Sequence, residues 1–189
     1  MTNYTQEAKK IVTDCLKALR PSEQLQQEAT TELRVGHITE QFAAELRQHA
    51  RTESLNVRNA ACAKLDALAG RFATAAKAAD APNGDALTGG DYKLLAGNFP
   101  LSVEEFTELC ERNKSNPTIL RAAMVYGSKN GDLAPYAKKY YRSAAERVAM
   151  FNKLLKCAKG ILDTEPTSPA RGDPYWNMIA REAAPWSVL

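Results

Sequence analysis

His49 and the two glutamates at helical spacing around it are the residues best placed to do chemistry together. Glu45 and Glu53 lie four residues before and after His49, so a single helix face would carry an imidazole between two carboxylates. Such groups bind divalent metals such as zinc. Solvated helices often carry glutamate near histidine without binding a metal. No other segment of the sequence supplies a matching set of ligands. We therefore expect a solvated helix face, with no metal and no other cofactor.

Motifs of known enzyme classes are missing from the sequence. It contains no phosphate-binding glycine loop, no G-x-G-x-x-G, no H-E-x-x-H and no G-x-S-x-G. The other histidine, His37, follows Gly36 and is predicted to lie in a loop or helix cap. Catalysis needs complementary acid and base groups that converge in one pocket. We therefore expect a protein that is not an enzyme.

The cysteines also lack the spacing of a metal site or a redox pair. Cys15, Cys62, Cys110 and Cys157 are 47, 48 and 47 residues apart, and none belongs to a C-x-x-C pair. Each falls on the apolar face of an expected helix. The pattern predicts reduced, buried thiols that pack as small hydrophobic side chains.

A group of basic residues near the C-terminal end could contact a nucleic acid. On a helix over residues 133–162, five cations fall within an arc of about 100° when residues are placed at 100° per position: Lys138, Lys139, Arg142, Lys153 and Lys156. Basic side chains along a helix displace counterions from phosphates. An accessory protein that binds nucleic acid is therefore the alternative function. A merely solvated face is the other interpretation, since few aromatic side chains interleave for base stacking.

The last part of the chain gathers residues typical of a protein interface. Both tryptophans lie there, within the set Tyr175, Trp176, Ile179, Trp186, Val188 and Leu189. Aromatic anchors of this kind dominate many interfaces. The same side chains could instead pack on the chain's own core. The preceding Arg171-Gly172-Asp173 is interpreted as a linker followed by a helix N-cap.

The composition predicts the elements that must position all these groups. Among 189 residues there are 31 Ala and 19 Leu but only 12 Val and Ile together, which favours an all-α helical bundle of about six to seven helices. The first twenty residues interleave charged and apolar positions, and the longest apolar run, residues 122–126, is far too short to span a membrane. We expect a cytoplasmic protein without membrane contact. Its net charge of +3 is concentrated in residues 132–189.

Turn residues divide the chain into two predicted helical lobes. Residues 1–81 form the N-terminal lobe, and residues 82–90 form a loop with Pro, Asn-Gly and Gly-Gly signals. Residues 91–162 form the C-terminal lobe, and residues 163–189 form a linker, a short helix and an apolar tail.

Within the lobes, most helix boundaries follow from local signals. Pro21 is predicted to end a first helix that begins at about residue 4, and a weaker helix follows over residues 22–36. Apolar or small residues over 42–76 recur every 3.78 residues, which predicts a break near residues 51–54. One unbroken helix of about 60 Å is the alternative. A heptad pattern predicts a single helix over residues 133–162.

Two start signals lie between these long segments. Ser102 and Glu105 form the S-x-x-E capping box, and Asn116-Pro117 places an N-cap before a first-turn proline. A helix-turn-helix interpretation of this region is disfavoured, because its packing positions would be Glu108, Arg112 and Lys114. Two capped core helices are expected instead.

The run from Leu101 through Arg121 and Tyr126 to the Asn130-Gly131 turn resembles small helical proteins encoded among the structural genes of tailed bacteriophages and prophages. This resemblance implies a virion-associated or head-assembly role without catalysis, in the host cytoplasm or the virion. Together with the heptad pattern and the tryptophans, it favours a non-catalytic helical interaction or assembly protein. Its expected partner is a protein, either another copy in a homo-oligomer or an assembly partner.

Overall fold

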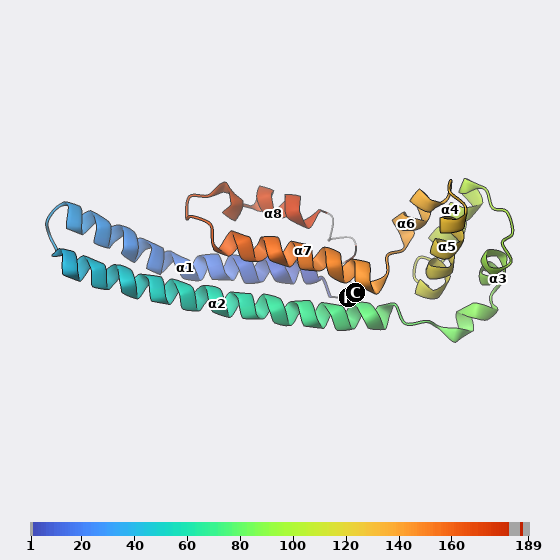
Figure 1. Cartoon of the computed structure of the whole chain (residues 1–189), viewed down its shortest axis with the longest axis horizontal. Helices are drawn as coiled ribbons and strands as arrows, with labels where there is room; N and C mark the ends of the chain where they lie inside the picture. Colours follow the sequence, from blue (N-terminus) through green and yellow to red (C-terminus); the bar gives the residue numbers. More distant parts are fainter. Residues whose placement is uncertain (1, 182–185, 187–189) are drawn as a thin grey trace. The chain divides into compact units, whose positions relative to one another are not determined.

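The structure, a computed structural model, describes residues 2–181 and 186, without the side chains of residues 86 and 88. Over these residues it is all-helical and contains no β-strand, as predicted (Figure 1). Eight α-helices are described rather than six or seven, with two 3-10 helices: α1 (Tyr4–Arg34), α2 (Glu40–Ala79), η1 (Gly84–Thr88), α3 (Gly90–Ala96), α4 (Val103–Arg112), α5 (Pro117–Lys129), α6 (Ala134–Tyr140), α7 (Ala144–Leu162), η2 (Pro169–Arg171) and α8 (Asp173–Ala180). None of the described helices is both long and apolar enough to cross a membrane.

The chain forms two compact units. Unit 1 contains Met1–Phe72 and Met150–Leu189, and unit 2 contains Ala73–Ala149. Unit 1 therefore includes both the first helix and the last described helix, and the divisions fall within α2 and α7. The sequence predicts a different division, at the turn-rich loop 82–90 between the lobes 1–81 and 91–162.

In unit 1, three helices pack around a group of aromatic rings. α1 and α2 run antiparallel (Figure 1), so that Tyr4 meets Phe72 edge-on at a centroid distance of 5.2 Å. Phe151 of α7 lies 4.4 Å from Phe72 and 6.3 Å from Tyr4, again between ring centroids. All three rings are buried. They connect the start of α1, the second half of α2 and the start of α7.

α1 continues through Pro21, where the sequence predicted its end, so that prediction is wrong. The predicted helix over residues 22–36 is the C-terminal part of α1. A proline inside a helix removes a hydrogen bond and crowds the preceding turn, at a cost of about 3 kcal/mol. Leu19 before it and Ala29 after it are fully or almost fully buried. Apolar burial on both sides of the proline outweighs this local cost.

α2 is unbroken over 40 residues, so the predicted break near residues 51–54 is wrong and the single long helix is confirmed. The expected pattern began at Phe42, which is 49% exposed, whereas its neighbour Ala43 is buried. This shift brings the mean spacing closer to the 3.6 residues of a straight helix. The buried positions of α2 are Ala43, Ala50, Ser54, Ala61, Leu65, Leu68, Phe72 and Ala76.

The expected single helix over residues 133–162 is two helices, α6 and α7, so that prediction is also wrong. The backbone is extended at Tyr141, with φ −135° and ψ 135°. Ser143 then starts α7: its N–H donates to Glu146 Oε2 at 2.9 Å, and the Glu146 N–H donates to Ser143 Oγ at 3.3 Å. This reciprocal pair is a capping box.

Asp80, just after α2, holds this corner in place within unit 2. Its Oδ2 accepts from the Ala144 N–H at 3.1 Å, and its Oδ1 accepts from the Tyr141 hydroxyl at 2.7 Å. Burial and this hydrogen bond raise the pKa of Tyr141 to about 12. Of the predicted heptad positions in α7, Phe151, Leu155, Ala158 and Leu162 are buried, whereas Ala144 and Val148 at its start are only half-buried.

Unit 2 is built from short helices, of which α4 and α5 begin at side-chain caps. The Ser102–Glu105 capping box is confirmed, and Asn116 Oδ1 accepts from the Ile119 N–H at 3.3 Å at the start of α5. The helices enclose one apolar core of Leu95, Phe106, Leu109, Cys110, Ile119, Leu120, Ala123, Tyr126, Leu133, Ala137 and Tyr141. Two capped core helices are thus present where a helix-turn-helix was disfavoured.

Candidate partner-binding site

The surface of unit 2 has an apolar hollow of about 340 Å³ along α5, which we call the α5 groove. It is lined by Pro82, Leu87, Tyr92, Leu95, Ala96, Asn98, Thr118, Arg121, Ala122, Val125, Tyr126 and Lys129. Its volume lies within the range of ordinary ligand pockets, about 300–1,000 Å³.

One face of α5 forms the floor of the groove. The lining residues of this helix are Thr118, Arg121, Ala122, Val125, Tyr126 and Lys129. Steps of three and one residues place all of them on a single stripe of a helix. The opposite side of α5, with Ile119, Leu120 and Ala123, is buried in the core of unit 2. α5 thus carries apolar residues around more of its circumference than the rest of unit 2 covers, so part of its apolar surface is left exposed.

The first wall is the end of α3, whose geometry is fixed by a left-handed residue. Asn98 has φ 51°, a conformation that asparagine tolerates better than most side chains. Its N–H donates to the Leu95 carbonyl at 3.3 Å, and the Phe99 N–H donates to the Leu94 carbonyl at 3.2 Å. These two bonds form a Schellman motif, which ends the helix beside the groove.

The second wall is η1, held to α5 by a side-chain hydrogen bond. The Asn83 N–H donates to Thr118 Oγ1 at 2.7 Å, and Asn83 Oδ1 accepts from the Asp85 N–H at 3.0 Å. Thr118 is buried, so this contact does not compete with solvent. η1 carries Leu87 to the rim of the groove, where 42% of it is exposed.

Tyr126 ties the floor to the segment between α3 and α4. Its hydroxyl donates to the Phe99 carbonyl at 2.7 Å and accepts from the Leu101 N–H at 3.1 Å. The side chain is 4% exposed, and both bonds are to backbone groups. The shape of the groove is therefore fixed by hydrogen bonds on three sides.

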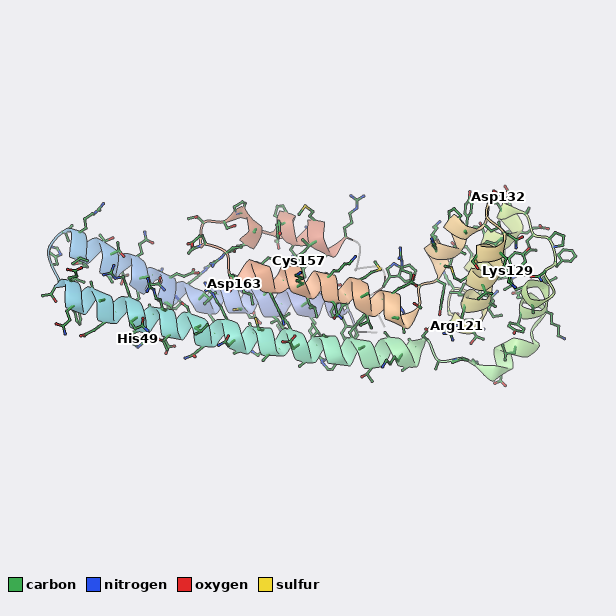
Figure 2. All side chains as sticks on the ribbon, in the orientation of Figure 1. His49, Arg121, Lys129, Asp132, Cys157 and Asp163 are labelled. Atoms are coloured by element: carbon green, nitrogen blue, oxygen red, sulfur yellow. The ribbon has the colours of Figure 1, made fainter. Side chains whose placement is uncertain are left out.

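The groove offers apolar contact flanked by positive charge. Val125 is 53% exposed on its floor, and Arg121 and Lys129 lie one turn before and after it on α5 (Figure 2). The two cations are about 12 Å apart along the helix axis at 1.5 Å per residue. No aspartate or glutamate lines the groove, and neither cation forms an ion pair with a residue that the structure describes. This arrangement suits an apolar ligand with carboxylates at its edges.

The sequence carries one signal for this groove. Residues 122–126 are five consecutive apolar residues inside a helix. At 100° per residue they cover the whole circumference, so one short amphipathic helix cannot bury them all. Met124 is partly buried against the core, and Val125 is the residue left facing out.

The five basic residues expected on one helix do not share one. Lys138 and Lys139 belong to α6 in unit 2, Arg142 lies between the helices, and Lys153 and Lys156 belong to α7 in unit 1. Lys139 lies over the ring of Tyr140, with its Nζ 5.4 Å from the centroid. Contact of these residues with nucleic acid stays a prediction. The single continuous helix face on which that prediction was based is not present.

The aromatic tail is used in part by unit 1 itself. Trp176 is 5% exposed and lines a small hollow together with Val12 and Leu16 of α1. Tyr175, Ile179 and Trp186 are half-buried. Val188 and Leu189 lie outside the described residues. Trp176 therefore packs on its own core, which was the alternative to an interface.

Arg171 and Asp173 have structural roles within unit 1. Arg171 Nη1 donates to Glu23 Oε1 at 2.7 Å and its side chain is 11% exposed, while Asp173 pairs with Lys9 at 2.7 Å. These contacts hold η2 and the start of α8 against α1. The predicted N-cap is wrong by one residue, because Gly172 is the N-cap of α8 and Asp173 is its first helical residue. Arg171 ends η2 instead of lying in an irregular linker.

His49 lies on the exposed face of α2 (Figure 2). The described residues contain no group of three His, Cys, Asp or Glu side chains that could hold a metal ion. His37 Nδ1 lies 2.7 Å from Glu32 Oε2, a partner that the sequence did not indicate.

All four cysteines are free thiols. Cys15 and Cys110 are buried as predicted, and burial raises the pKa of Cys110 to about 11. Cys62 is half-buried. Cys157 is exposed, so the prediction is wrong there, because it lies off the buried heptad face of α7.

Comparison with known proteins gives no further guide to this site. No protein-family model, no curated protein and no solved structure matches the chain. The α5 groove is therefore the feature from which we infer a function.

Proposed function

We propose that this chain is a non-catalytic helical interaction protein that binds its partner in the α5 groove. The partner is a helical segment of another protein, with an apolar face flanked by carboxylates about 12 Å apart. The observation that carries the proposal is the exposed apolar floor at Val125, set between Arg121 and Lys129 with no acidic residue in the lining. Helix-in-groove recognition uses this combination of apolar anchors and charged edges.

The two kinds of contact have different roles in this complex. Covering Val125 and Leu87, which are 53% and 42% exposed, removes apolar surface from water and gives most of the affinity. The exposed cations add little affinity but steer an acidic partner and set its orientation. Binding should therefore weaken only modestly as salt is raised.

The location of the groove fits an assembly role. Its floor, α5, falls within residues 101–131, the segment that resembles small helical proteins of tailed-phage structural genes. A rigid groove for one helix of a second protein is what a virion-associated or head-assembly component would need. Among the described residues, the lining includes no histidine, cysteine, aspartate or glutamate.

A selection from a library of helical peptides displayed on an unrelated carrier tests the proposal. We expect the enriched peptides to combine apolar residues on one face with acidic residues two turns apart. Their affinity should fall about tenfold or more for Val125→Glu, which places a carboxylate on the apolar floor. Arg121→Glu should weaken binding less. Met178→Glu is the matched control, because Met178 is 62% exposed on α8 and does not line the groove.

Three outcomes would contradict the proposal. Enriched peptides could be basic, or could bind Val125→Glu and the wild-type chain equally well. Light scattering could show that the wild-type chain self-associates and that Val125→Glu alone is monomeric. In that last case the occupant of the groove is a second copy of this chain.

A further inference from the structure

A polar hollow of about 440 Å³ is formed by residues of unit 1 alone. One wall belongs to α2, with Arg51, Ser54 and Arg58. The facing residues include Asp163 and Glu165, which follow α7. Asp163 marks this end of α7 in Figure 2. We call this hollow the Ser54 pocket; it shares no residue with the α5 groove.

Two polar groups on the α2 wall are buried without a partner. Ser54 is 5% exposed, and its hydroxyl makes no hydrogen bond with any described residue. The same holds for Arg58 Nε, one turn further along α2. Buried polar groups nearly always have a hydrogen-bond partner, and one without a partner destabilises the folded chain. A ligand atom that accepts hydrogen bonds would satisfy both groups.

Part of the surrounding wall is held rigidly. Arg171 donates from Nη1 to Glu23 Oε1 at 2.7 Å and from Nε to Thr164 Oγ1 at 3.3 Å. Both of these acceptor residues line the pocket, and Arg171 and Glu23 are 11% and 16% exposed. The charge of Glu23 is thus compensated, and α1 is joined to the segment after α7.

The remaining charges define the ligand. Arg51 and Arg58 are on the α2 wall, and Asp163 and Glu165 are on the other. A simple anion would be attracted by the guanidinium groups but repelled by the two carboxylates, and a simple cation would meet the reverse. A molecule with a carboxylate at one end and an ammonium group at the other satisfies both walls.

We propose that the Ser54 pocket binds a small zwitterion. Its carboxylate accepts hydrogen bonds from Ser54 Oγ and Arg58 Nε, and its ammonium group faces Asp163 and Glu165. The pocket volume of about 440 Å³ is sufficient for a small organic molecule of this kind.

Calorimetric titration of the full chain with unbranched amino acids of increasing length is the test. The probes are glycine, 4-aminobutyrate and 6-aminohexanoate, with acetate and butylamine as probes of a single charge. We expect one of the zwitterions to bind about tenfold more tightly than either control. The length that binds best measures the distance between the two charged walls.

Two variants connect this binding to the unpartnered groups. Ser54→Ala and Arg58→Met should each reduce zwitterion affinity by about tenfold or more, the effect of losing a hydrogen bond to a charged group. Ser54→Ala should also raise the melting temperature of the free protein, because it removes a buried hydroxyl with no partner. Arg47→Met is the matched control on α2, since Arg47 Nε donates to the Ala43 carbonyl at 3.1 Å and does not line the pocket.

Each of the following results would overturn the proposal. Acetate could bind as tightly as the best zwitterion, which would indicate an anion site. No probe could bind at millimolar concentration. Both variants, with backbone amide spectra like that of the wild type, could keep full affinity. Ser54→Ala could lower the melting temperature, which would mean that an ordered water already occupies this position.

Discussion

Units 1 and 2 differ in the length of their helices and in what determines the helix boundaries. In unit 2 the helices α3 to α6 are 7–13 residues long, and α4 and α5 begin at side-chain caps. In unit 1, α1 is 31 residues long and continues through a proline, and α2 runs for 40 residues through the polar Ser54. A short helix has few residues to bury, so a cap supplies a larger share of its stability and marks where it begins. A long helix with one continuous buried face can tolerate a residue that disfavours helix or burial, such as Pro21 or Ser54.

The candidate sites reflect the same difference. The α5 groove exists because a 13-residue helix with apolar residues around its circumference lies in a small unit that covers only part of it. The Ser54 pocket exists because a long buried face continues past one polar side chain. The α5 groove is formed by apolar surface that unit 2 leaves exposed. The Ser54 pocket lies beside a polar residue in an otherwise apolar row.

The largest expected effect comes from removing the central ring of each core. Phe72→Ala in unit 1 and Phe106→Ala in unit 2 should each cost about 3–5 kcal/mol, the usual penalty for a large buried side chain and the cavity left behind. Phe72 and Phe106 are 1% and 0% exposed. Amide hydrogen exchange should show the loss of protection concentrated in the unit that carries the substitution. Equal loss in both units for either variant would contradict the division into two cores.

Pro21→Ala should stabilise unit 1 by about 2 kcal/mol. The substitution restores a backbone hydrogen bond inside α1 and relieves the crowding of the preceding turn, together worth about 3 kcal/mol, less up to about 1 kcal/mol for the greater freedom of the unfolded chain. Urea unfolding followed by circular dichroism measures the change. If the variant were less stable, the proline would be serving a bend that α1 needs, and the argument that packing overrides it would fail.

Gly127→Ala should destabilise unit 2 by about 1–2 kcal/mol. A Cβ at this position would lie 2.8 Å from the Cβ of Ala137 and 3.4 Å from the Leu133 carbonyl oxygen, so α5 and α6 would have to separate. Gly160→Ala in α7 is the matched control, because a Cβ there meets nothing within 4 Å. The control should gain up to about 1 kcal/mol from helix propensity. Thermal unfolding of both variants gives the comparison, and equal stabilisation would show that α5 and α6 do not depend on this close approach.

The sequence predicted the short capped helices better than the long ones. Ser102-x-x-Glu105 and Asn116-Pro117 each place a helix start at one residue, and both starts are confirmed. Ser143-x-x-Glu146 is the same signature as the first of these, but the heptad pattern that runs across it hid the boundary between α6 and α7. Periodicity indicates which face is buried and does not exclude a change of direction.

The candidate sites were only partly visible in the sequence, for physical reasons. Residues 122–126 show that some apolar surface must face outward, but which neighbours form the walls depends on tertiary packing. The spacing of the row over residues 42–76 predicts a helix break near residues 51–54, the segment that contains Ser54, but α2 continues through it. The row stays intact because its other members are buried, and the hydroxyl is left beside the pocket.

Ser143→Ala should destabilise the corner between α6 and α7 by about 1 kcal/mol, the usual effect of losing a helix N-cap. The variant removes the oxygen that accepts from the Glu146 N–H, while Asp80 still accepts from the Ala144 N–H. Ser128→Ala is the control, because its exposed hydroxyl donates only to the Val125 carbonyl. Hydrogen exchange of the first turn of α7 is the sensitive measurement. Unchanged protection there would mean that Asp80 alone defines the start of the helix.

The smallest effect concerns acid, which should weaken unit 2 before unit 1. Hydrogen bonds from Ser102 and Ser143 lower the pKa of Glu105 and Glu146, and Arg112 lowers that of Asp91. All three carboxyl groups belong to unit 2. A carboxyl whose pKa is lower in the folded state contributes stability that is complete above its unfolded value, about 4 to 4.5. This stability is lost as the pH falls through the lower, folded value.

Hydrogen exchange below pH 4.5 should therefore show α4 and α7 opening first at their capped ends. Glu146→Gln should reduce this pH dependence at α7, whereas Glu53→Gln, on an exposed position in the middle of α2, should leave it unchanged. A similar acid response of both variants would assign the effect to net charge rather than to the caps.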